Sequence, residues 1–590
     1  MKPETKEVVR KFGDEEIKVL YVKSQPAGVG GAKDSFPPLM PSVTVENGIR
    51  LERDVAVPLR DGTIIYTDVY RPDGVTRVPS IIGWTPFGKR NHTTTPPQWQ
   101  SLLKDGVVSP MAKFECPDPA YWCPRGYAII NPDPRGVGFS QGDFLHAGTQ
   151  EGRDGYDLVE WVAAREWSSG KVGMMGNSWA AMAQWYTAAE KPPHLTCIAP
   201  WEGISDIYRE HMCWGGFPEI GFTGWLLGDQ LAFGPGYAED IVAMARSYPL
   251  MNGYWEDKVA KLENIEVPAY ITAGWCHFHL RGSTEAFRRI SSPNKWLRIH
   301  RDFEWVDNFY PENLADLQLY FDHYLKGIPN SWPLTPRVRI DVMDAGEFDY
   351  QHWRPEKEFP LARTLYQKLY LDAKTGKMTK TPVSDASSVS YDAKVNHEVQ
   401  PVSYDAMKGH MANFTMAFDE DTELTGYLKL KLWVEADGAD DMDLFVTIQK
   451  LDEEGKQLPM RYQAGDSVYY AHPGLPGKLR VSLRELDLER SKEYKPVRNY
   501  LHPQPLRPKE IVPVDVEVWP TSILWHAGQQ IRAVVSAYYF REKGWWEAAA
   551  FTWETINRGT HIIHTGGEYD SHLLVPVIPP RYATRTHTYR

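Results

Sequence analysis

The sequence predicts a chain of the α/β class, with a mostly parallel β-sheet covered by helices on both faces, an inserted helical cap and a C-terminal β-sandwich. Three observations lead to this prediction. Strand-like and helix-like segments alternate through the first part of the chain. A stretch rich in tryptophan, phenylalanine and glycine then breaks the alternation. After about residue 335 helical periodicity disappears, and short strand-like runs separated by turns replace it.

The length of the chain sets the number of domains. At 590 residues it is too long for one hydrophobic core. We expect an N-terminal arm over residues 1–44, an α/β domain over 45–201 and 265–330, a helical cap over 202–264, and a jelly-roll β-sandwich over 335–590.

The first part of the chain contains the alternating elements. Residues 50–84 hold three strand-like runs separated by Asp-Gly and Pro-Asp-Gly turn signals. Residues 127–136 form another buried run that ends in a turn, and residues 154–166 have apolar positions at helical spacing. The run 171–175 leads into a serine turn and an alanine-rich helix, and 195–201 is the next strand.

The cap region and the segments after it continue the pattern. Residues 202–264 begin with aromatic residues, glycines and methionines and then become helical. Residues 267–275 and 295–301 are predicted strands with a helix-like stretch between them. Residues 312–327 are a predicted helix closed by a glycine. The later runs LKLKLWVEA, MDLFVTIQKL, VPVDVEVWP and IRAVVSAYYF are strand-like.

Composition excludes several classes of protein. The net charge is −12 without a cluster of lysines and arginines, so neither a nucleic-acid nor a membrane partner is expected. The charged N-terminus lacks the apolar region of a secretory signal, and no run approaches the ~18 apolar residues of a membrane span. The five cysteines have no zinc-binding spacing, so we expect free thiols and a cytoplasmic protein; a Cys116–Cys123 disulfide is the alternative.

Two serines lie in a Gly-x-Ser-x-Gly/Ala pattern, Ser140 and Ser178. A nucleophilic serine on an α/β sheet needs a strand before it and a helix after it, because the sharp turn between them exposes the hydroxyl. Only Ser178 has both, since Ser140 is followed by a loop-like stretch. We therefore predict Ser178 as the nucleophile, with a structural turn serine as the alternative.

Residues 50–590 resemble the cocaine esterase-like (CocE/NonD) hydrolases, which also include X-Pro dipeptidyl peptidases and α-amino acid ester hydrolases. The resemblance is carried, in order, by VPLRDGTIIYTDVYRPDG, the DPRG turn, KVGMMGNSWA, APWEGISDIYRE and EVWPTS. It implies an α/β-hydrolase domain with a helical cap and a C-terminal jelly roll, together with serine hydrolase chemistry.

The chain departs from the family pattern in three places. Where the family has its catalytic acid, in a Gly-Trp-Tyr-Asp-like stretch, this chain has Gly-Trp-Cys-His with His277 as its last residue. Where the family has its histidine, this chain has Glu304. The place of a family tyrosine that donates to the oxyanion is taken by Phe87.

These departures suggest that base and acid have exchanged loops. A triad needs an imidazole within reach of the serine and a carboxylate on its other nitrogen, and either loop can supply either group. We predict His279 as the base because it lies two residues further into its loop than His277, and Glu304 as the acid. His277 and then His300 are the alternative bases, and Asp302 is the rival acid. A surface carboxylate paired with Arg301 is the other interpretation of Glu304.

The remaining site residues are predicted from position. The oxyanion hole should use the backbone N–H of Trp179, which follows the nucleophile, and a backbone N–H from the loop at Phe87–Gly88. Glu202 follows a sheet strand and would anchor a substrate ammonium group if the enzyme were an aminopeptidase, or would simply cap a turn. The substrate pocket is predicted to include Trp201, Glu202, Trp214, Phe217, Trp225 and His277. A cap core explains the aromatic members equally well.

The predicted function is hydrolysis of a small-molecule carboxylic ester through an acyl-enzyme. An amidase or aminopeptidase-like acyl hydrolase is the first alternative, and a non-catalytic binding protein on the same fold is the second. No cofactor or metal is expected, because the sequence holds no P-loop, Rossmann glycine fingerprint or cluster of metal ligands. A homo-oligomer is left open.

Overall fold

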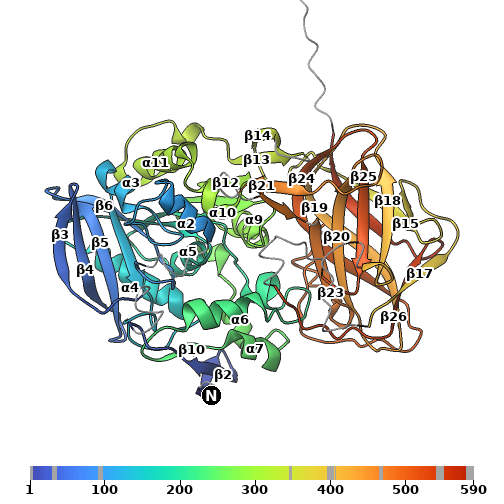
Figure 1. Cartoon of the computed structure of the whole chain (residues 1–590), viewed down its shortest axis with the longest axis horizontal. Helices are drawn as coiled ribbons and strands as arrows, with labels where there is room; N and C mark the ends of the chain where they lie inside the picture. The colour runs from blue at the N-terminus through green and yellow to red at the C-terminus, as the bar shows by residue number, and fades with distance from the viewer. Residues whose placement is uncertain are drawn as a thin grey trace, which may run out of the picture. The chain divides into compact units, whose positions relative to one another are not determined.

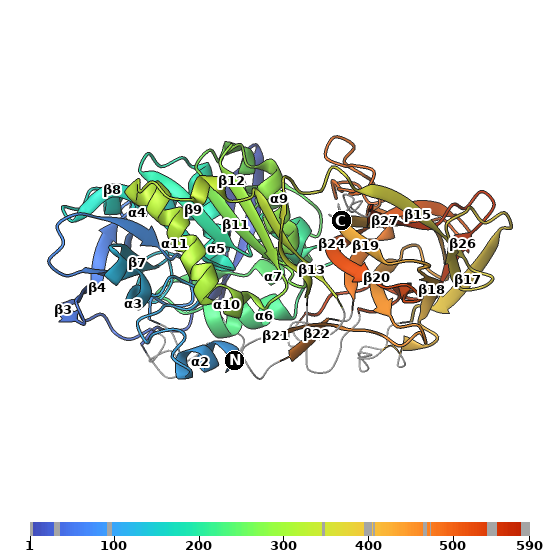
Figure 2. The same cartoon turned by 90° about the horizontal axis from the view of Figure 1, so that it is seen from above.

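The computed structural model describes residues 4–28, 36–90, 97–344, 349–394, 404, 407–463, 469–472, 474–539 and 551–579 (Figures 1 and 2). The chain divides into two compact units. The first comprises the described residues of Met1–Arg339, Tyr462–Tyr470 and Gly544–Glu554, and the second those of Ile340–Arg461, Ala471–Lys543 and Thr555–Arg590. None of the helices in the described ranges combines the length and the apolar character that crossing a bilayer requires.

A β-sheet forms the centre of the first unit. In order of pairing its strands are β3 (Ser42–Glu46), β4 (Ile49–Pro58), β5 (Ile64–Pro72), β7 (Ala128–Asp133), β6 (Val78–Ile82), β8 (Ser168–Asn177), β9 (Leu195–Trp201), β11 (Ala269–Gly274) and β12 (Lys295–His300). The strands from β7 to β12 are parallel, which confirms the predicted α/β sheet. Their carboxyl ends therefore meet at one edge, where ligands of such sheets usually bind.

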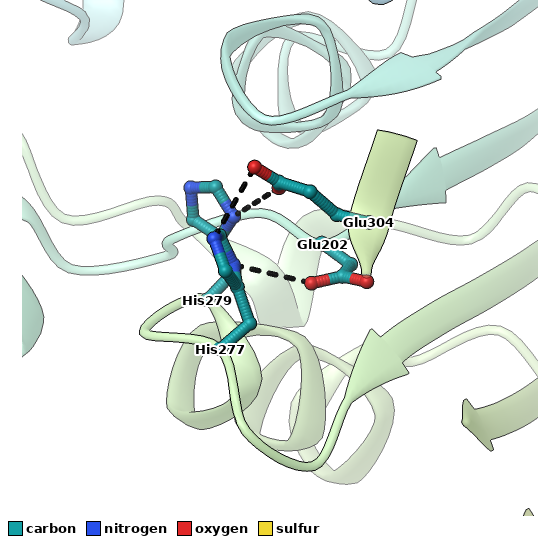
Figure 3. A group of neighbouring side chains, drawn as sticks. All are labelled: Glu202, His277, His279 and Glu304. Atoms are coloured by element: carbon teal, nitrogen blue, oxygen red, sulfur yellow. Dashed lines mark ion pairs between the residues drawn. The ribbon is translucent and has the colours of Figure 1, made fainter. Parts of the chain in front are cut away.

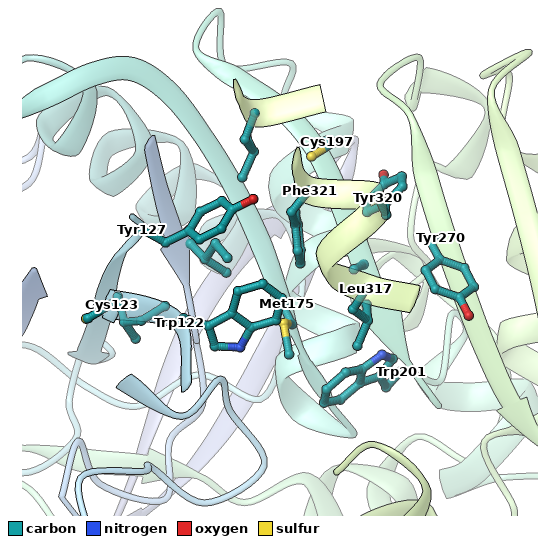
Figure 4. Packing of buried hydrophobic residues seen from close by; sticks show 14 of the residues in the cluster. Trp122, Cys123, Tyr127, Met175, Cys197, Trp201, Tyr270, Leu317, Tyr320 and Phe321 are labelled. Atoms are coloured by element: carbon teal, nitrogen blue, oxygen red, sulfur yellow. The ribbon is translucent and has the colours of Figure 1, made fainter. Parts of the chain in front are cut away.

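Helices pack against this sheet, and the hydrophobic core of the first unit lies between the two. The helices are α2 (Pro97–Lys104), α3 (Pro119–Trp122), α4 (Thr149–Ala163), α5 (Trp179–Ala189), α9 (Leu280–Arg289), α10 (Glu304–Asp307) and α11 (Pro311–Lys326). Leu317, Tyr320 and Phe321 of α11 belong to one buried cluster with Met175 of β8 and Cys197 of β9 (Figure 4). The predicted helix at 312–327 is thus present, and its final glycine caps it with a φ of 70°.

The region between β9 and β11 consists of short helical segments and one strand. These are η2 (Tyr208–Met212), α6 (Phe222–Leu226), η3 (Leu227–Leu231), β10 (Tyr237–Glu239), α7 (Ile241–Ser247), α8 (Gly253–Asp257) and η4 (Leu262–Asn264). The helical character of residues 202–264 is therefore confirmed, although each helix is short.

The N-terminal segment is more ordered than an arm. Strands β1 (Thr5–Phe12) and β2 (Glu15–Lys23) form a hairpin, and β2 also pairs with β10. The turn between them is possible because Gly13 adopts a φ of 59°. The interpretation of residues 1–44 as a surface arm missed this hairpin, whose alternating exposed and half-buried residues in β1 are a strand pattern.

The second unit is built of strands. The strands of the second half of the chain are β13 (Val338–Met343), β14 (Asp349–Glu356), β15 (Leu365–Asp372), β16 (Lys377–Thr379), β17 (Ser387–Asp392), β18 (Met411–Ala417), β19 (Thr422–Asp437), β20 (Asp443–Leu451), β21 (Met460–Gln463), β22 (Tyr469–His472), β23 (Leu475–Arg480), β24 (Val512–Trp525), β25 (Gln530–Ser536), β26 (Thr560–Thr565) and β27 (His572–Ile578). Short 3₁₀ turns lie in the first unit at η1 (Cys123–Arg125) and η5 (Trp332–Leu334), and in the second unit at η7 (Val481–Leu483). The strands of the second unit close on themselves like a barrel. In this ring β15 pairs with β27, β27 with β19 and β19 with β24, and the pairing continues onward to β18 and β16. The all-β character is confirmed, and the jelly-roll topology stays a prediction.

The five cysteines are all buried free thiols, so the described residues contain no Cys116–Cys123 disulfide.

Candidate active site

Ser178 lies in a strained turn between β8 and α5. Its φ of 53° and ψ of −115° are unusual for a residue with a side chain. The turn is tight: a Cβ on Gly176 would lie 2.6 Å from the Cβ of Ala180 and 2.8 Å from the carbonyl oxygen of Glu115. Small residues at 176 and 180 therefore allow the chain to reverse, and the turn places Ser178 at the N-terminus of a helix, as predicted.

Ser140 has a structural environment instead. Its hydroxyl donates to the carbonyl oxygen of Asp133 over 2.8 Å and accepts from the backbone N–H of Tyr66 over 3.0 Å. The side chain of Ser140 is fully buried, so the serine of this second Gly-x-Ser-x-Gly match stabilises a turn.

The structure brings His279 and Glu304 to Ser178. Ser178 Oγ lies 3.5 Å from His279 Nε2, and His279 Nδ1 lies 3.2 Å from Glu304 Oε2. His279 directly precedes α9, and Glu304 is the first residue of α10, so both come from loops at the carboxyl ends of neighbouring parallel strands. Serine, imidazole and carboxylate thus follow one another in the order that the exchanged-loop prediction requires. Figure 3 shows the carboxylate of Glu304 beside the two histidines, His277 and His279.

The alternative base and acid residues have other partners. His277 faces Glu202 with Nδ1 at 3.1 Å and Glu304 with Nε2 at 3.2 Å. His300 Nε2 lies 2.8 Å from Glu202, and His300 Nδ1 contacts the backbone oxygen of Asp302 at 3.1 Å. Glu304 is 3 % exposed, which contradicts its interpretation as a surface carboxylate.

Electrostatics favours an ionised Glu304 and a neutral His279. Burial alone would raise the pKa of Glu304, but His277 and His279 outweigh it and hold that pKa well below its usual range. Burial lowers the pKa of His279, and His277 lowers it further, against the opposing effect of Glu304. A neutral imidazole is the form that accepts a proton from serine.

Sequence reasoning missed a second carboxyl group at this site. Glu115 Oε1 accepts hydrogen bonds from Asn177 Nδ2 at 3.2 Å and Trp305 Nε1 at 2.9 Å. Asn177 Nδ2 also donates to Glu304 Oε2 at 3.0 Å, so one amide joins both carboxyls. Burial, and then the charge of Glu304, raise the pKa of Glu115 well above its usual range. Glu115 belongs to no motif, so only its spatial neighbours reveal it.

Ser178 opens into a cavity with apolar walls. Its lining residues are Phe87, Phe114, Glu115, His146, Ser178, Trp179, Met182, Ile204, Ile207, His211, Phe222, Trp225, Leu226, Phe278, His279, Glu304 and Trp305. Of the six residues predicted to form the substrate pocket, this lining includes Trp225.

The other five predicted pocket residues, within the described chain, do not line this cavity. Trp201 and Phe217 are fully buried in the protein interior, and the ring of Trp214 packs under the guanidinium of Arg281. The carboxylate of Glu202 faces two histidines, one of them His277. These five residues therefore lie outside the described cavity, because proximity in sequence to the cap does not specify on which face of a cavity wall a side chain lies.

The two residues predicted to supply oxyanion donors have different surroundings. Trp179 is the first residue of α5, where a backbone N–H has no carbonyl partner within the helix. Its indole Nε1 donates to Glu151 at 2.7 Å, which holds the residue in place. The N–H of Phe87 instead donates to the hydroxyl of Thr85 at 3.1 Å. Phe87 lines the cavity, but its N–H is bonded to Thr85, so the second donor from the loop at Phe87–Gly88 stays a prediction.

Four side chains here also suit a divalent cation. The donor atoms of Glu202, His277, His279 and Glu304 all lie within 4.8 Å of one another, and all four residues are buried. Imidazole and carboxylate are common zinc ligands. The sequence offered no sign of this grouping, because the residues come from three separate loops.

Comparison with known proteins places the chain in a family. Residues 61–302 match the X-Pro dipeptidyl-peptidase family S15, and residues 330–574 match the C-terminal non-catalytic domain of X-Pro dipeptidyl-peptidases. The cocaine esterase of a Rhodococcus strain is 23% identical over 90% of this chain and 100% of its own length.

Solved structures agree with these matches. A CocE/NonD family hydrolase from Staphylococcus aureus is 31% identical, with a TM-score of 0.81 over 92% of this chain and 100% of that chain. An α-amino acid ester hydrolase, at 17% identity, shares the fold with a TM-score of 0.65 over 91% of this chain and 98% of its own. The chain therefore belongs to the CocE/NonD family of hydrolases and is a serine hydrolase of the esterase type.

Proposed function

We propose that this enzyme hydrolyses a carboxylic ester through an acyl-enzyme, with Ser178 as nucleophile, His279 as general base and Glu304 as the acid that orients it. The observation that carries the proposal is the pair of contacts on either side of one imidazole, Ser178 Oγ to Nε2 at 3.5 Å and Glu304 Oε2 to Nδ1 at 3.2 Å. The first distance is longer than a formed hydrogen bond, and such bonds often tighten only when substrate is bound.

The chemical steps follow from this order of groups. Ser178 Oγ attacks the acyl carbon while its proton passes to Nε2 of His279. The ester C–O bond then breaks, and the departing alkoxide takes that proton as it leaves. A water molecule next loses a proton to Nε2 and attacks the acyl carbon, and the serine oxygen recovers the proton as the acid is released. Glu304 stays ionised throughout and stabilises the imidazolium.

The N–H of Trp179 would stabilise the oxyanion of each tetrahedral intermediate. Its position at the start of α5 supports this role, because the helix N-terminus adds a partial positive charge. The predicted partner at Phe87 is already bound to Thr85. One missing donor typically costs ~3–4 kcal/mol in the transition state, so the identity of a second donor decides how efficient the enzyme is.

An ester is favoured over an aminopeptidase substrate. An aminopeptidase would need a carboxylate that meets the substrate ammonium, and Glu202 was the residue predicted for it. Its oxygens face His277 and His300 at 3.1 and 2.8 Å, and it is 1 % exposed. The cavity walls are mainly aromatic and aliphatic, which suits an apolar acyl or alcohol group. An amide remains the second choice.

Labelling with a fluorophosphonate and hydrolysis of p-nitrophenyl esters test the proposal. Wild-type protein should be labelled and active, whereas Ser178→Ala should be neither. Ser140→Ala is the matched control, since it removes the other serine of this pattern and should still be labelled. His279→Ala should lower kcat by a factor of ~10³ or more with the fold intact. Labelling that persists in Ser178→Ala would contradict the assignment of the nucleophile.

A further inference from the structure

Behind the proposed triad, histidines and carboxylates continue to alternate. Starting from His279, the order is Glu304, His277, Glu202 and His300, with nitrogen–oxygen distances of 3.2, 3.2, 3.1 and 2.8 Å along the row. All five side chains are buried. The last three of this row, His277, Glu202 and His300, have no role in the chemical steps above, and they are not among the residues that line the described cavity.

The two oxygens of Glu304 have different partners. Oε2 faces His279 and accepts from Asn177, while Oε1 faces His277. A buried carboxylate that is not compensated is strongly destabilised. Because His277 contacts the oxygen that His279 does not, it supplies compensation and fixes the rotation of the carboxylate at the same time.

His277 has a carboxylate oxygen at each ring nitrogen, from Glu202 and Glu304. A neutral imidazole carries one N–H and one lone pair, so one of its nitrogens would face an oxygen without a proton between them. Only the imidazolium presents a proton to both carboxylates.

Glu202 is itself held firmly. His300 contacts its Oε1, and His300 Nδ1 lies 3.5 Å from Asp307, which forms a two-pronged ion pair with the buried Arg298. The backbone of Glu202 adopts a φ of 48°, a strained value for a residue with a side chain. A Cβ on Gly274 would lie 3.0 and 3.1 Å from the two Glu202 oxygens, so the absence of a side chain at 274 makes room for the carboxylate.

We infer that His277 is a positioning residue, held between Glu202 and Glu304, that keeps the Glu304 carboxylate in the orientation needed by His279. The inference rests on the proposed function, since it concerns the acid of the same triad. It gives Glu202 the role of an anchor for His277 and removes it from substrate binding.

The test compares His277→Gln with wild type in ester hydrolysis over a range of pH. Gln keeps a donor but loses the charge. We expect kcat to fall about 100-fold while KM changes little, because substrate does not contact residue 277. We also expect the acid limb of kcat/KM to move to higher pH. The charge of His277 helps keep the pKa of His279 low, so its loss leaves the base protonated at a higher pH.

Among the described residues, the titratable groups that interact with His277 or His279 include Glu202, Glu304 and Glu115. Gly274→Ala is the second variant, because its added Cβ displaces the Glu202 carboxylate while every titratable residue is kept. It should move the acid limb of kcat/KM in the same direction by a smaller amount. His561→Gln replaces a buried histidine of the second unit and is the control that should leave the acid limb in place.

Two results would overturn the inference. One is a wild-type kcat and acid limb in both His277→Gln and Gly274→Ala, with folding verified by circular dichroism. The other is one equivalent of divalent metal in the purified enzyme whose removal by a chelator abolishes activity, which would make the same four residues ligands. Failure of the proposed function is separate, since it appears as absent labelling of wild type or persistent labelling of Ser178→Ala.

Discussion

Two carboxyl groups share one side-chain amide at this site, and they are expected to be in opposite ionisation states. Asn177 Nδ2 reaches Glu304 at 3.0 Å and Glu115 at 3.2 Å. Glu304 faces two histidines and keeps a low pKa, whereas Glu115 receives only neutral donors and has a raised pKa. Two adjacent negative charges in a buried site would repel one another, so a proton on Glu115 stabilises the ionised form of Glu304.

Glutamine substitutions separate these two states. Glutamine resembles a protonated carboxyl, so Glu115→Gln should retain kcat within a few-fold. Glu304→Gln removes the charge that stabilises the imidazolium and can select the wrong tautomer of His279. We expect a loss of several hundred-fold or more, on the order of ~4 kcal/mol. Asp302→Asn is the control on the same loop and should be near normal. Equal losses in the Glu115 and Glu304 variants would contradict the assignment.

The protonation of Glu115 also predicts how the stability of the protein depends on pH. A carboxyl whose pKa is raised by folding contributes stability that is fully present below the unfolded pKa of about 4.5 and is lost as pH rises through the folded pKa. Glu115→Gln lacks this dependence. The apparent Tm of the variant relative to wild type should therefore increase steadily from pH 4.5 upward. A constant difference in Tm across that range would show that Glu115 ionises normally.

At the scale of elements, the turn between β8 and α5 stores backbone strain that the rest of the unit must hold. Ser178 N–H donates to the carbonyl oxygen of Trp201 on β9, and Asn177 N–H donates to that of Glu115. The turn is thus tied on both sides, by a neighbouring strand and by the loop that carries Glu115. This explains how a conformation that costs of order 1–3 kcal/mol can persist at Ser178.

Gly176→Ala tests this tie. The added Cβ would collide with Ala180 and with the carbonyl oxygen of Glu115, and Gly176 has a φ of 144° that side chains rarely adopt. We expect a loss of about 2 kcal/mol or more in stability together with a marked fall in kcat, because the loop carrying Glu115 must move. Gly224→Ala, on a helix with open space at its Cβ, is the control for thermal unfolding. Normal activity in Gly176→Ala would mean that the turn tolerates a different shape.

At the scale of the whole chain, a late segment completes the first unit. Residues 551–554 lie against residues 218–222: Ile220 N–H donates to the carbonyl oxygen of Thr552, and Glu219 accepts from the N–H of Thr552. Phe551 packs against Phe222 and Phe278, with ring centroids 4.9 and 5.3 Å away. Both of those rings line the cavity, so a segment more than 300 residues distant supports the wall of the proposed pocket.

Phe551→Ala should therefore alter substrate preference more than chemistry. Removing the ring leaves space behind Phe222 and Phe278, so short-acyl p-nitrophenyl esters should bind with a higher KM while kcat changes less. Steady-state kinetics over a series of acyl lengths measures this. Glu554→Ala is the matched control on the same segment, since its ion pair with Arg246 is partly exposed and should contribute little. A uniform fall in kcat without a change in KM would contradict a role for Phe551 in the wall.

The sequence by itself determined the main strands and helices around the site, and it predicted the residues of the proposed triad. The strand and helix around Ser178 are local patterns, and so are the parallel strands that bring residues 279 and 304 to one edge of the sheet. The exchange of base and acid stays a prediction, which rests on the two loops that depart from the family pattern and which the contacts of His279 support. Only the tertiary structure decided which side of a wall each side chain occupies. Glu115, Asn177 and Phe551 join the site through contacts between parts of the chain that are distant in sequence. Glu202, which was predicted as a pocket residue, contacts His277 instead. Local periodicity specifies the face of an element, whereas the pairing of buried charges depends on neighbours that sequence distance does not reveal.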